Sequence, residues 1–249
     1  MLFIFRKLRR SFFLPGKVRT YLAYALGEIA LIVVGILIAV QIGDWKDERK
    51  LDQQRLELIE NLKADFNASL QRLVETIEEG SNTNAELFEF LNLSVTENSH
   101  LSVDELKWLG GAAFRPYSFR PALNAYSSAR DNGSLALINN LELTELFIDF
   151  EEWYGNYQVN TNLDREFTLT GDSYEVRKRL GTMAVLRADT RFNTPDKFAL
   201  SDKDYLELIA QREVYAFFEL KYKLRGNQMR NLENLKPTIE QIIATLESL

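Results

Sequence analysis

The sequence predicts an all-α protein in which one N-terminal transmembrane helix continues into an antiparallel bundle of long helices. Three observations lead to this prediction. An apolar run near the N-terminus matches the roughly 20 residues that cross a bilayer. Long stretches free of proline carry apolar residues at spacings of three and four, as amphipathic helices do. No stretch shows a convincing strand alternation, and five prolines and twelve glycines are few turn formers for 249 residues.

The composition limits the chemistry that the chain can perform. A hydrophobic fraction of 46% supplies a core and excludes wholesale disorder. The absence of cysteine excludes disulfides, thiolate zinc sites, cysteine nucleophiles and a lipoprotein anchor. One histidine, His100, cannot form a histidine-rich metal site. We therefore expect no catalytic residues, no metal site and no cofactor, and we interpret the protein as not an enzyme.

Residues 1–20 predict a basic amphipathic tail. Apolar residues recur at spacings of three and four, and basic residues take the other face, which is typical of a helix lying on a membrane surface. The residues expected to contact anionic lipid are Arg6, Lys7, Arg9 and Arg10. The tail has no acid, whereas the rest of the chain is acidic, as expected of a protein that does not bind nucleic acid.

Residues 21–43 predict the transmembrane helix. They contain a single charged residue, Glu28, and are flanked by Tyr21 and Tyr24 on one side and Trp45 on the other, as in an aromatic belt. A cleaved signal peptide is the main alternative. It would have a shorter apolar core and small residues at the cleavage site, which the sequence at residues 40–42 does not offer. We therefore expect an uncleaved anchor.

The basic tail also predicts the orientation. Moving one positive charge outward across the membrane costs about 2.3 kcal/mol per 100 mV. The tail should therefore stay in the cytoplasm, and residues 44–249 should form an exported helical bundle. This pattern predicts a single-pass protein of a bacterial inner membrane, with a cytoplasmic N-terminus and a periplasmic domain.

Glu28 needs an explanation because a charge inside a bilayer is costly. At 100° per residue it shares a helix face with Gly35 and Ala39, a pair of small residues four apart that lets two helices approach closely. One interpretation is packing against a second copy or another membrane protein. The alternatives are a proton-responsive carboxyl, and a side chain that reaches the headgroups or pairs with Arg19.

The pattern predicts the following elements in residues 44–249. A helix over residues 44–79 should end at Gly80, with Ser81 or Asn82 capping the next one. A short helix should cover residues 122–131, and a long one should begin near Leu141. Residues 181–200 suggest a loop, and Ser201 should cap the last long helix, which Pro237 kinks or divides. The buried face expected for that helix comprises Tyr205, Leu208, Ile209, Phe217, Leu220 and Leu224.

Two blocks of sequence resemble a known family. They are GEIALIVVGILIAVQIGDWKDERK at residues 27–50 and AYSSARDNGSLALINNLEL at residues 125–143. Together they are similar to the bacterial membrane-anchored proteins of the domain of unknown function 6090 family. The chain has Gly-Asp-Trp-Lys at residues 43–46, where members usually have Asn-Asn-Trp-Asn. The resemblance implies a basic tail, a span and an acidic helical domain, and it implies no activity.

Four residues are weak candidates for contact with a ligand or a partner: Tyr126, Arg130, Trp153 and Tyr157. Aromatic residues at helical spacing are more often part of the core. In the structural interpretation of the second block, Tyr126 packs inward and Gly133 ends a helix. The favoured function is a non-enzymatic interaction or scaffold module. The alternatives are a ligand-sensing domain that signals through a membrane partner, and an accessory subunit of a proton-driven complex that uses Glu28.

Overall fold

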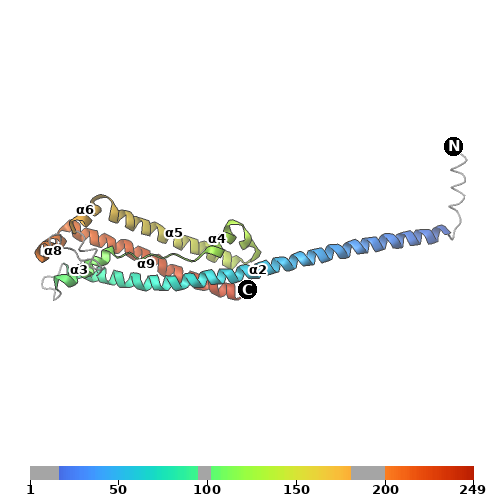
Figure 1. Cartoon of the computed structure of the whole chain (residues 1–249), viewed down its shortest axis with the longest axis horizontal. Helices are drawn as coiled ribbons and strands as arrows, with labels where there is room; N and C mark the ends of the chain where they lie inside the picture. The colour runs from blue at the N-terminus through green and yellow to red at the C-terminus, as the bar shows by residue number, and fades with distance from the viewer. Residues whose placement is uncertain (1–16, 95–101, 181–199) are drawn as a thin grey trace, which may run out of the picture. The chain divides into compact units, whose positions relative to one another are not determined.

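The computed structural model describes residues 17–94, 102–180 and 200–249 (Figure 1). In these ranges every regular element is helical and no strand occurs, which confirms the predicted all-α class. The elements are α2 (Lys17–Leu93), α3 (Val103–Gly111), η1 (Ala112–Phe114), α4 (Asn124–Asp131), η2 (Ser134–Leu137), α5 (Leu141–Leu169), α6 (Gly171–Leu180), α8 (Asp202–Ile209) and α9 (Arg212–Glu247). His100, the tail residues Arg6, Lys7, Arg9 and Arg10, and the loop expected at residues 181–200, up to residue 199, lie outside the described residues.

The chain divides into two compact units, residues 1–57 and residues 58–249. The described part of the first unit belongs to α2. Its large apolar side chains from Tyr21 to Ile42 are exposed, as they would be if lipid surrounded them. Among the helices that the structure describes, α2 is the one long and apolar enough to cross a membrane. These properties fit a membrane protein.

The predicted helix end at Gly80 is wrong, because α2 continues through Gly80, Ser81 and Asn82 to Leu93. The glycine serves close packing instead of termination. A Cβ atom at Gly80 would clash with the Met229 sulfur and would lie 3.1 Å from the Tyr117 ring. Any larger residue would therefore push both neighbours away.

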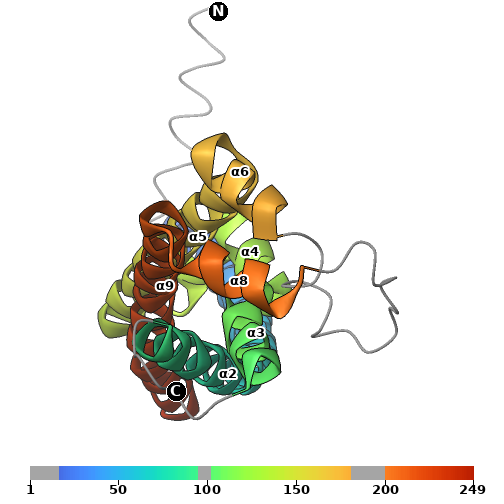
Figure 2. The ribbon, with the colours of Figure 1, turned by 90° about the vertical axis from the view of Figure 1, so that its left-hand side faces the viewer.

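In the second unit three long helices lie side by side: α2 from Leu58 onward, α5 and α9 (Figures 1 and 2). Figure 1 shows that α9 runs opposite to the other two, whereas α2 and α5 run in the same direction. The bundle is therefore antiparallel only with respect to α9. Two parallel neighbours require a connection that returns along the bundle.

The non-helical segment of residues 115–123, with the start of α4, makes that return. The Ser69 hydroxyl accepts a hydrogen bond from the Ala122 amide at 2.9 Å. Further along, the Asp65 carboxylate accepts the Ala125 amide at 2.7 Å and the Tyr126 amide at 3.2 Å. Asp65 thus caps α4, whose own N-cap residue offers no side-chain hydrogen bond.

One core cluster surrounds Phe66 of α2, whose side chain is fully buried. Its ring centroid lies 5.8 Å from that of Tyr126, 5.7 Å from that of Phe147 and 5.4 Å from that of Phe150. These distances are within the favourable range for aromatic pairs. The cluster joins α2, α4, α5 and α9.

A second core cluster joins the other end of α2 to α3, α6, α8 and α9. Phe90 and Phe218 meet there, with ring centroids 4.4 Å apart. At the edge of this cluster the Lys107 amine of α3 lies 2.6 Å from the Asp202 carboxylate of α8. Both core clusters belong to the same compact unit.

The last two helices depart from the prediction. Ser201 does cap a helix, since its hydroxyl accepts the Asp204 amide at 3.1 Å, but this helix is the short α8. The long helix begins at Arg212 and contains Pro237 without being divided. The prediction is confirmed for Phe217, which is buried, and for Tyr205, Leu208 and Ile209, which are buried but belong to α8. It is wrong for Leu220, which is 46% exposed, whereas the next residue, Lys221, is 2% exposed.

Candidate functional site

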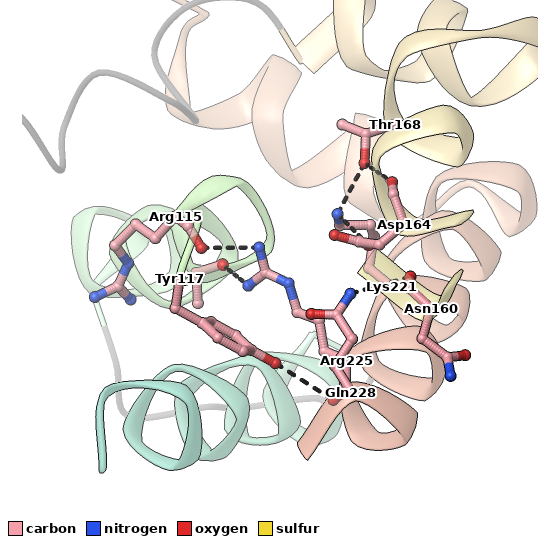
Figure 3. A network of polar contacts seen from close by, with 9 residues as sticks. Arg115, Tyr117, Asn160, Asp164, Thr168, Lys221, Arg225 and Gln228 are labelled. Atoms are coloured by element: carbon pink, nitrogen blue, oxygen red, sulfur yellow. Dashed lines mark hydrogen bonds and ion pairs between the residues drawn. The ribbon is translucent and has the colours of Figure 1, made fainter. Parts of the chain in front are cut away.

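A pocket of about 280 Å³ lies in the bundle, between η1, α5, α6 and α9. Polar side chains from distant parts of the chain meet there (Figure 3). Its lining includes Tyr117 after η1, Asp164 and Thr168 of α5, Arg177 of α6, and Lys221, Arg225 and Gln228 of α9. The expected buried face did not include these α9 residues.

A buried ion pair forms the centre of this pocket. The Lys221 amine donates to the Asp164 carboxylate at 2.6 Å and to the Thr168 hydroxyl at 2.8 Å. The Thr168 hydroxyl in turn donates to the backbone carbonyl of Asp164 at 2.7 Å, one helical turn earlier. The Lys221 side chain is 2% exposed and that of Asp164 is 16% exposed. The pair therefore joins α5 to α9, with its ammonium group buried and its carboxylate partly exposed.

Arg225 follows Lys221 by one turn and holds η1 against α9. Its guanidinium donates to the backbone carbonyls of Ala112 and Arg115, the latter at 2.9 Å. The Tyr117 hydroxyl donates back to the Arg225 carbonyl at 3.3 Å, and the centre of the guanidinium lies 5.7 Å from the Tyr117 ring centroid. A guanidinium is planar and has several N–H donors, so it can donate to two carbonyls and lie near an aromatic ring at the same time.

Burial shifts the ionisation of both cations. It lowers the pKa of Lys221 from 10.5 to about 8, and Arg225 and Arg177 add to this effect, while Asp164 opposes it. Burial also lowers the pKa of Arg225, against the opposing influence of Asp164 and Tyr117. A lysine with a lowered pKa is common at functional sites, although structural ion pairs show the same behaviour.

Raising the pH from 8 to 10 is expected to stabilise the folded chain through Lys221. The unfolded chain keeps this proton until about pH 10.5, whereas the folded chain releases it near pH 8. The unfolded state therefore binds more protons in this window, so the free energy of unfolding rises with pH. Urea unfolding of the full-length protein in detergent, compared with Lys221→Met, measures the effect. Identical slopes for the two proteins between pH 8 and pH 10 would contradict it.

A second pocket, of about 540 Å³, lies beside α4, η2 and α5 and contains two predicted residues, Tyr126 and Arg130. Both contact Glu151: the Tyr126 hydroxyl and the Arg130 guanidinium each donate to the same carboxylate oxygen at 2.8 Å. Arg130 lowers the pKa of Glu151, and burial raises the pKa of Tyr126. Since these groups satisfy one another, the pocket offers less unused binding capacity than the first.

The other two aromatic candidates do not line either pocket. Tyr157 is 2% exposed, and its hydroxyl accepts the Phe119 amide at 2.8 Å, which fixes the returning segment. Trp153 is partly buried against the first core cluster. Gly133 adopts φ 78° just after Asn132, the C-cap of α4, as expected of a residue that ends a helix.

Glu28, Gly35 and Ala39 lie in α2, within the first unit, and all three are exposed. A Cβ atom at Gly35 would meet no atom within 4 Å. The face that these residues share is therefore open to a neighbouring helix.

A family model described as "Family of unknown function (DUF6090)" matches residues 28–211, well over half of the chain. The chain belongs to the DUF6090 family. This confirms the resemblance seen in the sequence. The DUF6090 match begins inside the apolar part of α2 and ends just before α9, so it includes Asp164 and Arg177 but not Lys221 or Arg225. No curated protein and no solved structure matches the chain.

Sequence reasoning missed Asp164, Lys221 and Arg225. A signal was present, because Lys221 and Arg225 lie at the positions that continue the apolar row of Val214, Phe217 and Phe218. A charged residue on an otherwise apolar face indicates a buried polar contact. Asp164 and Thr168 show the matching spacing of four residues on α5.

Proposed function

We propose that this protein is a non-enzymatic interaction module, anchored in a bacterial inner membrane by one span that pairs with a second copy. The observation that carries the proposal is the open face of α2, on which a carboxyl group and two small residues lie together. Small residues let helices approach closely, and a carboxyl in a bilayer is far less costly when it faces a partner helix. In this proposal the tail stays in the cytoplasm and binds anionic lipid, and the bundle lies in the periplasm.

Cysteine crosslinking in membranes tests the pairing directly. Because the chain has no cysteine of its own, a single introduced thiol reports only its own position. We expect Ala39→Cys, on the face of Glu28, to form a disulfide-linked dimer after oxidation in native membranes. Leu37→Cys, on the opposite side of the helix, is the matched control and should crosslink several-fold less.

A further substitution separates close packing from chance collision. Gly35→Leu, added to Ala39→Cys, should reduce the crosslinked fraction because the bulkier side chain separates the helices. Monomer alone at both cysteine positions, or equal crosslinking at both, would contradict the proposed pairing.

A C-terminal alkaline phosphatase fusion tests the orientation, since this reporter is active only outside the cytosol.

A further inference from the structure

The pocket around Lys221 carries more positive than negative charge. Among the residues that the structure describes, its lining contains four basic side chains, Arg165, Arg177, Lys221 and Arg225, and one acidic side chain, Asp164. Asp164 is already the partner of Lys221. Buried charge without a counter-charge is costly, and Arg225 is 3% exposed. An anion in the pocket would reduce this cost.

The pocket also contains hydrogen-bonding groups that the protein leaves unused. The Nε of Arg225 and the hydroxyl of Thr161 are buried and have no hydrogen-bond partner among the described residues. Both residues line the pocket. The Lys221 amine has three protons, and two of them are taken by Asp164 and Thr168. Buried polar atoms without a partner, in residues that line a pocket, are expected where water or a ligand supplies the partner.

The size and the walls of the pocket restrict the ligand further. A volume of about 280 Å³ is just below the usual range for ligand sites, about 300–1,000 Å³. Phe114, Pro116 and Leu169 add apolar surface beside the basic groups. The pocket therefore suits a compact molecule with an oxyanion group and a small apolar body.

We propose that this pocket binds a small organic anion, with a carboxylate or phosphate group held by Arg225, Lys221 and Thr161 and attracted by Arg177 and Arg165. The site lies wholly within the bundle and goes beyond the interaction module proposed above. Occupancy would connect η1, α5, α6 and α9, the four elements that line the pocket.

Calorimetric titration of the full-length protein in detergent tests this proposal, with malonate as the carboxylate probe and inorganic phosphate as the other. Sodium chloride at equal ionic strength is the baseline. We expect saturable binding of at least one probe and a rise of about 2 °C or more in the midpoint of thermal unfolding at saturation. The stronger of the two responses identifies the oxyanion.

Arg177→Gln is the decisive variant, because Arg177 lines the pocket and makes no hydrogen bond to another described residue. It should weaken binding at least about tenfold, whereas Arg177→Lys should retain part of it. Lys178→Gln is the matched control, since it removes the same charge from the next residue of α6, outside the pocket, and should bind as the wild type does. No binding of either probe, or equal binding by Arg177→Gln and the wild type, would overturn the proposal. Neither result depends on whether the spans pair.

Discussion

Replacing Phe66 with alanine is expected to lower the free energy of unfolding by about 3–5 kcal/mol, as large-to-small substitutions of buried phenylalanine do. The ring is fully buried and contacts Tyr126, Phe147 and Phe150. Its removal leaves a cavity among three aromatic rings held by α4 and α5, so little collapse can fill the space. Since domains are stable by only about 5–15 kcal/mol, this loss is a large part of the total.

Phe88→Ala provides the matched control, because it makes the same change in the same helix at a side chain that is 50% exposed. Phe88 contacts the Tyr222 ring at a centroid distance of 5.6 Å, and its truncation should cost no more than about 1 kcal/mol. Urea unfolding of both full-length variants in detergent, followed by circular dichroism, measures the difference. Equal destabilisation by the two substitutions would show that the Phe66 cluster is not the centre of the core.

Asp164→Ala is expected to cost about 3 kcal/mol at pH 7, the low end of the range for breaking a buried ion pair. The substitution leaves the Lys221 ammonium, which is 2% exposed, without its counter-charge. The partial exposure of Asp164 lets water enter and moderates the loss. Glu219→Ala on the same α9 is the control, because its pair with Lys223 is exposed and should contribute at most about 0.5 kcal/mol.

A double variant distinguishes the cost of an unpaired charge from the value of the pair. Asp164→Leu combined with Lys221→Met removes both charges and keeps apolar volume, so its stability should recover to within about 1 kcal/mol of the wild type. The comparison uses unfolding midpoints at constant denaturant slope. A double variant as unstable as Asp164→Ala would show that packing around these side chains, and not the isolated charge, determines the loss.

The all-α class and the apolar span were predictable because both depend on patterns within a few helical turns. The length of α2 was not, because the expected stop at Gly80 rested on backbone preference alone. The contacts that fill the space beside Gly80 come from Tyr117 and Met229, which are remote in sequence. A single sequence does not distinguish a glycine that ends a helix from a glycine that makes room for side chains of another element.

The two pockets show the same limit of prediction from local sequence patterns. Tyr126 and Arg130 were predicted because they lie in one short block, and the structure does place them in one pocket. Lys221 and Asp164 meet across 57 positions, and hydrophobic spacing favoured Leu220 for the buried face. The shift of one residue matters, because it exchanges an apolar side chain for a charged one. Lys221 can be buried because Asp164 on α5 supplies its counter-charge.

The cap that Asp65 supplies to α4 has a consequence for the order of folding. An isolated helix of eight residues is unstable in water, and the acceptor for its first amides lies 60 positions earlier in the chain. Helix α4 therefore depends on α2 for its N-terminal cap, and we expect it to become stable only once the part of α2 around Asp65 is helical. During synthesis α2 emerges first, so the acceptor is already present when its donors arrive.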